Sequence, residues 1–120
     1  MGEVTQLQEA LRDFARRRDW EQFHSPKNLA SAMIVEAGEL LEHFQWLTER
    51  QSRELDEKTR AEVAMEMADV FIYLLRLADQ LDVDLMQSAQ TKMAINEDRY
   101  PVELSRGNAK RPDTSGKSDP

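Results

Sequence analysis

The fold class is decided by one apolar stretch, Val63-Ala64-Met65-Glu66-Met67-Ala68-Asp69-Val70-Phe71-Ile72-Tyr73-Leu74-Leu75. Wound as a helix, this stretch is apolar on nearly all sides, which is typical of a helix buried by its neighbours. Glu66 and Asp69 interrupt it, and their spacing of three residues places them on one face with Tyr73. The stretch therefore predicts a buried helix that directs two acids and a phenol to the same side.

The sequence on either side of this stretch is also helical in pattern. Apolar residues recur at intervals of three and four between Lys27 and Tyr100, where there is one glycine and no proline. Ser25 and Asp84 are expected to cap two of the helices. We expect four helices, over residues 5–19, 26–46, 59–81 and 85–100. An aromatic loop at 20–24 joins the first two, and a polar link at 48–58 joins the second to the third. The predicted fold class is therefore all-α, with four principal helices.

The length of 120 residues limits the chain to one domain. We expect a helical domain over residues 1–104 and a polar tail over residues 105–120, which has too few apolar side chains to pack and is expected to be disordered. The net charge is −7, and because the tail contributes +2, the helical part carries −9. Such an acidic body disfavours binding to a nucleic-acid polymer, which depends on many Lys and Arg contacts.

The sequence also predicts a cytoplasmic location. Its first residues lack a basic region followed by an apolar run, and 18 consecutive apolar residues occur nowhere, so neither secretion nor a membrane span is expected. The absence of cysteine excludes disulfide frameworks and thiolate metal sites.

Two further acids, Glu36 and Glu39, share the flank of the second expected helix with His43. Burying Glu66 and Asp69 without a cation costs free energy, and a second acidic pair adds repulsion. Four carboxylates from two facing helices form a site of hard oxygen ligands, which suits Mg²⁺ or Mn²⁺. For Glu36 and Glu39 the alternative is a solvated helix face.

A di-iron carboxylate centre is the competing kind of metal site. It requires a Glu-x-x-His unit on each of two helices. Glu21 and His24 have this spacing but lie in the expected loop, and the residue three positions before His43 is Leu40. The sequence therefore argues against redox iron.

The last expected helix carries a stripe of hydrogen-bond donors, because Lys92, Asn96 and Arg99 are spaced by four and then three residues. Such donors can hold phosphate groups, although a solvated face is the common alternative. Trp20 and Trp46 flank the second helix, and each can stack on a nucleobase or serve as a core or subunit contact.

The spacing Glu36-Ala37-Gly38-Glu39, 26 intervening residues, then Glu66-Met67-Ala68-Asp69 resembles the metal motif of the MazG-like, all-helical nucleoside triphosphate pyrophosphatases. The resemblance covers about residues 15–104 and is strongest to the dCTP pyrophosphatase branch. It departs from the family pattern at Val35, where many members carry a second glutamate. Four segments carry the similarity to that branch: Arg18-Asp19-Trp20-Glu21-Gln22-Phe23-His24, Gly38-Glu39-Leu40 with Phe44-Gln45-Trp46, Asp69-Val70-Phe71-Ile72-Tyr73-Leu74, and Lys92-Met93-Ala94-Ile95-Asn96 with Arg99-Tyr100-Pro101.

This resemblance implies a four-helix-bundle-like fold and a Mg²⁺-dependent hydrolase, for which Mn²⁺ can substitute. The reaction would cleave a nucleoside triphosphate between its α and β phosphates. The implied substrate is dCTP, including dCTP modified at cytosine carbon 5, and the implied role is control of the nucleotide pool. Residue by residue, it places the catalytic metal ligands at Glu36, Glu39, Glu66 and Asp69, the phosphate contacts at Lys92, Asn96 and Arg99, and the base and sugar contacts at Trp20, His24, Trp46 and Tyr73.

The resemblance also implies a homo-oligomer, namely a tetramer built as a dimer of dimers. A helix that is apolar nearly all round in so short a chain favours such symmetric association. Two other functions stay open: a noncatalytic helical adaptor whose acidic groove binds a basic partner, and a pyrophosphatase of the same fold that acts on another nucleoside triphosphate.

Overall fold

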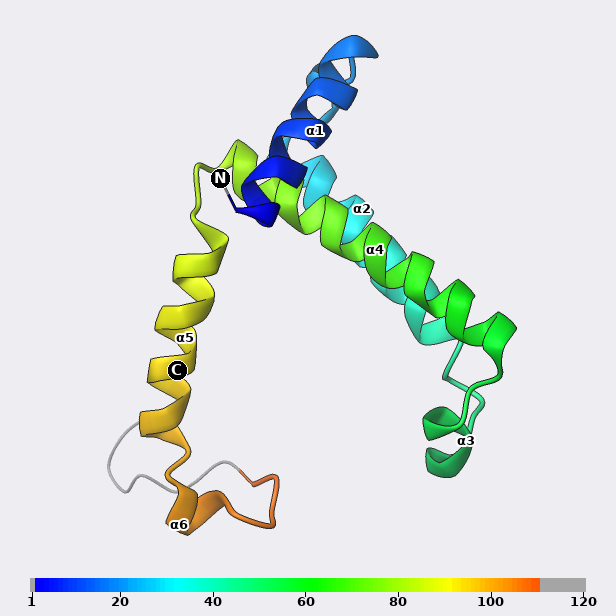
Figure 1. Ribbon diagram of the computed structural model, residues 1–120, viewed down its shortest axis with the longest axis vertical. Coiled ribbons are helices and arrows are strands. Elements are labelled where there is room, and N and C mark those ends of the chain that lie inside the picture. The colour runs from blue at the N-terminus through cyan, green and yellow to red at the C-terminus, as the bar shows by residue number, and fades with distance from the viewer. Residues whose placement is uncertain (1, 111–120) are drawn as a thin grey trace. The chain divides into compact units, whose positions relative to one another are not determined.

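The computed structural model describes residues 2–110, and these residues form helices and connecting turns without a strand. The all-α prediction is confirmed, and the four long helices lie close to their expected positions (Figure 1). In chain order the elements are α1 (Glu3–Arg17), the 3₁₀ turn η1 (Glu21–Phe23), α2 (Pro26–Glu42), α3 (Glu49–Arg53), α4 (Glu57–Gln80), α5 (Leu85–Arg99) and α6 (Val102–Ser105).

The chain divides into two units, Met1–Val83 and Asp84–Pro120. In the first unit, α2 and α4 form an antiparallel pair along most of their length, and α1 packs against α4 (Figure 1). The second unit contains α5 and α6. The paired helices α2 and α4 therefore provide the scaffold on which the first unit places its acidic side chains.

Side-chain caps fix where the helices begin. The side chains of Ser25 and Asp84 each accept a hydrogen bond from a backbone N–H in the first turn of the next helix, which confirms both predicted caps. Thr48 and Gln51 form a reciprocal capping box that starts α3. The polar link predicted over residues 48–58 therefore contains a short helix that was not predicted, although the Thr-x-x-Gln spacing is visible in the sequence.

The ends of two helices also differ from the expectation. α1 ends at Arg17 rather than Asp19, and Asp19 has a φ of 55°, in the left-handed region where a helix cannot continue. α2 ends at Glu42, and residues 43–46 are turns rather than a continuation of the helix. After Pro101, α6 runs on to Ser105. Of the tail that is predicted to be disordered, residues 105–120, the part from 111 to 120 lies outside the described residues.

The single chain has a thin hydrophobic core. The buried apolar residues of the described chain lie on α1, α2 and α4 and are Ala15, Leu29, Val63, Leu75 and Ala78. The expectation that α4 is buried on most sides was wrong for one chain, because Met65, Met67 and Phe71 stay exposed. Packing α2 on α4, with α1 against α4, still leaves outer apolar side chains such as Ile34 on α2 and Met67 on α4 exposed.

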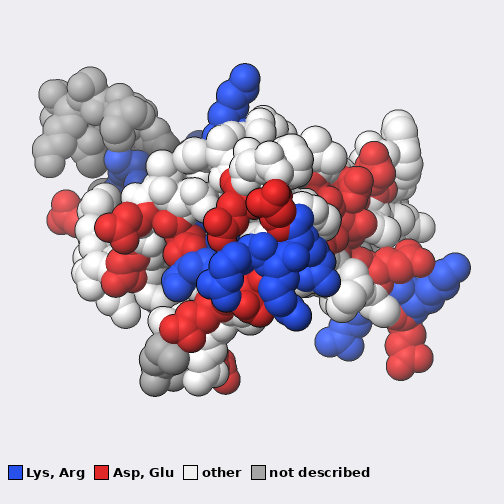
Figure 2. Space-filling view, turned by 90° about the horizontal axis from the view of Figure 1, so that it is seen from above, with Lys and Arg blue, Asp and Glu red and all other residues white. Residues whose placement is uncertain are grey.

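Charged side chains of both signs are interspersed on the surface. On the face shown in Figure 2, a central patch of basic side chains is bordered by acidic ones, and further basic side chains lie apart from it. On α1, Asp13 Oδ1 lies 2.6 Å from Arg16 Nη2, and Asp13 Oδ2 lies 3.0 Å from Arg17 Nε. Part of the basic charge is therefore paired within the helix. Within residues 2–110, no helix has the length and apolar character that a membrane crossing requires.

Candidate functional site

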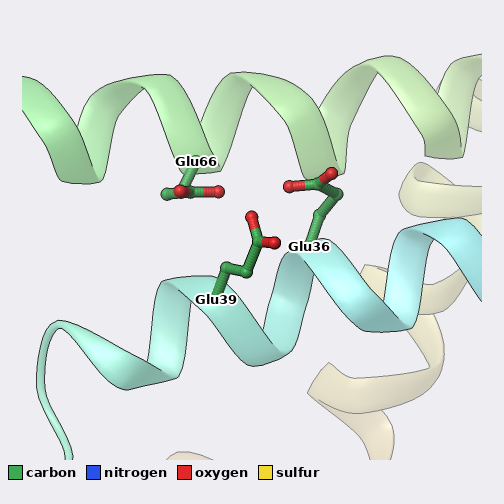
Figure 3. Close-up of side chains that lie close together, drawn as sticks. All are labelled: Glu36, Glu39 and Glu66. Carbon is green, nitrogen blue, oxygen red and sulfur yellow. The ribbon is translucent and has the colours of Figure 1, made fainter.

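Three glutamates from the two paired helices meet between them. One carboxylate oxygen of Glu36, one of Glu39 and one of Glu66 all lie within 4.8 Å of one another. Figure 3 shows Glu36 and Glu39 rising from α2 toward α4, while Glu66 descends from α4 toward them. Spacings of three residues put Glu36 and Glu39 on one side of α2, and the packing of α2 on α4 makes that side face Glu66. We call these three residues the acidic cluster.

The acidic cluster is electrostatically strained. Hydrogen bonding with Glu39, followed by burial, raises the pKa of Glu36 to about 7. Burial, and then the charge of Glu39, raises the pKa of Glu66. Both shifts show that the site resists a full set of negative charges.

Two oxygens of the cluster have no hydrogen-bond partner in the described part of the chain. Oε2 of Glu36 and Oε2 of Glu66 are buried, and neither has a hydrogen bond to a described residue. Within residues 2–110, no Lys or Arg forms an ion pair with Glu36, Glu39 or Glu66. Buried carboxylate oxygens without donors are costly, so the arrangement fits a bound cation. The atoms that could ligate such a cation are all carboxylate oxygens, and the acidic cluster can therefore hold a metal ion of the hard class.

Asp69, the fourth predicted ligand, lies one turn beyond Glu66 on α4. It is exposed and stands outside the group of three, but its charge contributes to the raised pKa of both Glu36 and Glu66. The structure thus brings three of the four predicted carboxylates into one cluster and places the fourth within electrostatic reach.

A cavity of about 380 Å³ has Asp69 in its wall, one turn of α4 beyond Glu66. Three of the predicted base and sugar residues, Trp20, His24 and Tyr73, also line this cavity. The Trp20 ring lies edge-on to the His24 ring at 6.4 Å between centroids. The complete lining consists of Leu11, Phe14, Ala15, Trp20, His24, Asp69, Ile72, Tyr73 and Arg76. A mostly apolar cavity with a few polar groups is typical of a site for a small organic ligand.

The remaining predicted residues lie elsewhere in the chain. Trp46 follows α2, is 87% exposed, and is not part of the cavity wall. The predicted phosphate contacts belong to α5 in the second unit, where Lys92 is exposed and Asn96 and Arg99 are half-buried.

The sequence did not reveal the role of Arg76. Arg76 is 3% exposed, and its Nη1 donates a hydrogen bond of 3.2 Å to Asp79 Oδ2. It also faces His24, with its Nε 3.4 Å from His24 Nδ1. The spacing of three residues between Arg76 and Asp79 signals the ion pair, but nothing in the sequence signals the contact with His24, which lies 52 residues away.

Known proteins are similar to this chain in sequence. Mouse (Mus musculus) dCTP pyrophosphatase 1 is 50% identical over 99 residues, which are 81% of this chain and 58% of the mouse protein. Human (Homo sapiens) dCTP pyrophosphatase 1 is 44% identical over 101 residues, which are 82% of this chain and 59% of the human protein. This chain thus spans less than two thirds of the length of these relatives.

One solved structure is similar to this chain along almost the whole length of the solved protein. The crystal structure of a pyrophosphatase from Archaeoglobus fulgidus matches with a TM-score of 0.80 and 39% identity, and the match covers 84% of this chain and 94% of that one. The MazG-like family model matches residues 32–112, which include all four predicted metal ligands. Because that match covers more than half of the sequence, this chain belongs to the MazG-like family.

Proposed function

We propose that this protein is a Mg²⁺-dependent nucleoside triphosphate pyrophosphohydrolase that converts dCTP to dCMP and pyrophosphate. The observation that carries this proposal is the acidic cluster, in which two buried carboxylate oxygens have no hydrogen-bond partner within residues 2–110. Asp69, one turn beyond Glu66, lies in the wall of an aromatic cavity. The names of the mouse and human relatives support dCTP as the substrate, and the archaeal neighbour supports pyrophosphatase chemistry. Nucleotide-pool control in the cytoplasm is the role that such a reaction would serve.

Phosphoryl transfer requires the protein mainly to position its reactants and to neutralise charge on the phosphate oxygens. Glu36, Glu39 and Glu66, with Asp69 beside them, would hold Mg²⁺, or Mn²⁺ in its place. When bound, the ion supplies positive charge to the phosphate oxygens and lowers the pKa of a coordinated water. A carboxylate of this set that does not ligate the ion would accept the proton of the attacking water.

The cavity supplies the nucleoside contacts in this proposal. Its size lies within the usual range for small-ligand sites, and Trp20 offers an aromatic face on which a base can stack. His24 and Tyr73 offer the polar groups that an apolar wall alone lacks, and polar contacts are what separate one base from another. We retain Trp46 as a further stacking residue, which its exposure leaves available.

Phosphate contacts are proposed for Lys92, Asn96 and Arg99 on α5. Lys92 supplies a point charge, Asn96 an amide donor, and Arg99 a planar fork that matches two phosphate oxygens. Their spacing of four and then three residues supports the proposal, because residues so spaced lie on the same side of a helix.

We also propose that the chain works as a homo-oligomer, a tetramer assembled as a dimer of dimers. Apolar side chains on α2 and α4, including Ile34 and Met65, are about two-thirds exposed, at 66% and 65%. A symmetric partner would remove such side chains from water, and each Å² of apolar area so buried contributes roughly 25 cal/mol.

The test is pyrophosphate release from every common ribo- and deoxyribonucleoside triphosphate, measured with Mg²⁺ and with a chelator. We expect turnover only with Mg²⁺ and fastest with dCTP. Faster turnover of another nucleotide would correct the substrate but keep the reaction. Absence of pyrophosphate release with all nucleotides would contradict the proposal and favour a binding protein with an acidic groove.

A further inference from the structure

Four side chains form a continuous chain of hydrogen bonds that ends at the cavity wall. Arg12 on α1 donates from Nε to Asp79 Oδ2 at 2.7 Å, and Arg76 Nη1 donates to the same oxygen at 3.2 Å. The other side of the Arg76 guanidinium faces His24, with Nε at 3.4 Å and Nη2 at 3.3 Å from Nδ1. Two charged pairs on helices α1 and α4 are thereby connected to one imidazole ring.

The chemistry of the guanidinium group determines what His24 Nδ1 must be. Arginine carries five N–H donors and no acceptor, so an imidazole nitrogen that faces it must present a lone pair. A neutral imidazole with a lone pair on Nδ1 carries its proton on Nε2. Nε2 has no hydrogen-bond partner among residues 2–110, and the ring belongs to the cavity wall. The polar atom that His24 keeps for a bound molecule is therefore an N–H donor.

The surroundings of Arg76 make this arrangement rigid. Its side chain is almost completely buried, so its donors need acceptors inside the protein. Asp79 satisfies one side of the group and is itself anchored by Arg12. A positive charge on His24 would lie against this buried cation, and burial followed by the charge of Arg76 lowers the pKa of His24, while Glu21 opposes the shift.

We propose that Arg76, anchored by Asp79, is a positioning residue that holds His24 as the neutral tautomer protonated on Nε2, so that His24 donates a hydrogen bond to an uncharged acceptor of the bound nucleoside. The acceptor would be a carbonyl oxygen or ring nitrogen of the base, or a sugar oxygen, rather than a phosphate. The inference rests on the proposed function, since it takes the cavity to be the nucleoside site. Arg76 touches His24 and acts on the ligand through it.

The test begins with the tautomer, which can be observed without substrate. Long-range ¹H–¹⁵N NMR spectra of the full chain with ¹⁵N-labelled histidine distinguish a protonated from an unprotonated ring nitrogen. The chain has two histidines, and a His43→Gln variant assigns the His24 signals. We expect Nε2 to be protonated and Nδ1 unprotonated at neutral pH. A charged ring, or a proton on Nδ1, would overturn the inference whether or not the protein hydrolyses nucleotides.

The second part measures whether Arg76 sets this tautomer. Arg76→Met keeps an unbranched stem without donors, and Arg76→Lys restores a charged group that can donate. We expect the preference for Nε2–H to weaken in Arg76→Met and to recover in Arg76→Lys. An unchanged tautomer in Arg76→Met would overturn the role of Arg76. Where Arg76→Met does not fold, Asp79→Asn serves instead, because it leaves Arg76 in place but weakens its anchor.

Kinetics with dCTP separate positioning from general structural support. We expect Arg76→Met to raise KM by about tenfold, as for one lost hydrogen bond, while kcat changes much less. In a His24→Phe background the same change should have little further effect, because Arg76 then has no imidazole to orient. An equal loss in both backgrounds, or a loss confined to kcat, would contradict the proposal. Failure of the parent protein to release pyrophosphate would contradict the proposed function instead, and the tautomer result would stand.

Discussion

Glu36 on α2 and Glu66 on α4 face each other with one buried carboxylate oxygen each, and neither oxygen has a hydrogen-bond partner within residues 2–110. Glu39 lies between them, and Asp69 adds its charge from the next turn of α4. Packing α2 on α4 therefore concentrates negative charge at a partly buried position. A bound cation removes this cost, which links the stability of the helix pair to the activity that we propose for it.

Neutralising one carboxylate should remove most of the activity. We expect Glu66→Gln and Asp69→Asn each to lower kcat/KM for dCTP by on the order of 100-fold or more, because each removes a ligand or a proton acceptor. The measurement is pyrophosphate release at saturating Mg²⁺.

Glu62→Gln is the matched control for these variants. It makes the same chemical change one turn earlier on α4, at an exposed residue outside the acidic cluster, and should keep parental activity. Parental turnover in Glu66→Gln would show that the metal site lies elsewhere.

The metal-free protein should lose stability as the pH rises. The pKa of Glu36 is about 7 in the folded protein, raised from an ordinary 4.5 by hydrogen bonding with Glu39 and by burial. The folded state thus binds this proton more tightly than the unfolded chain does. The resulting stabilisation is complete below about pH 4.5 and is lost as the pH rises through about 7.

Melting temperatures in chelator at about pH 5 and about pH 8 test this linkage. We expect the decrease toward high pH to be larger in the parent than in Glu36→Gln, which has no proton to lose at this position. Equal decreases in the two proteins would show that Glu36 does not titrate in this range.

The exposed apolar face of α2 should mediate self-association. We expect Ile34→Lys to shift the mass measured by light scattering from the oligomer toward smaller species, because a charge would then be buried in the interface. Gln45→Lys adds the same charge at an exposed residue beyond the end of α2 and should leave the mass unchanged. A parent protein that is fully active as a stable monomer would contradict the proposed tetramer.

Helix positions could be predicted from the sequence because each depends on neighbouring residues. Ser25 and Asp84 act as caps through contacts three residues away, and the apolar stretch around Glu66 shows its period directly. The same local logic would have found α3, since Thr48 and Gln51 form its capping box within four residues.

The candidate site was only partly predictable, because its parts meet through tertiary packing. The pairs Glu36/Glu39 and Glu66/Asp69 are visible as spacings, but only the packing of α2 on α4 shows that Glu66 joins Glu36 and Glu39 while Asp69 stands outside the group. The contact of Arg76 with His24 joins α4 to the segment before α2. Its formation depends on how α1, α4 and that segment pack, which no local pattern encodes.

The most direct measurement of the central claim is the melting temperature of parent, Glu66→Gln and Glu62→Gln, first in chelator and then in excess Mg²⁺. If Glu66 is a metal ligand, Glu66→Gln should melt at or above the parent in chelator, because it relieves repulsion in the acidic cluster. In excess Mg²⁺ the order should reverse, since the parent gains binding free energy that the variant partly loses, while Glu62→Gln follows the parent in both conditions. A Glu66→Gln protein that melts well below the parent in chelator, with no effect of Mg²⁺ on either protein, would show that the glutamate is a structural partner and would contradict the metal site.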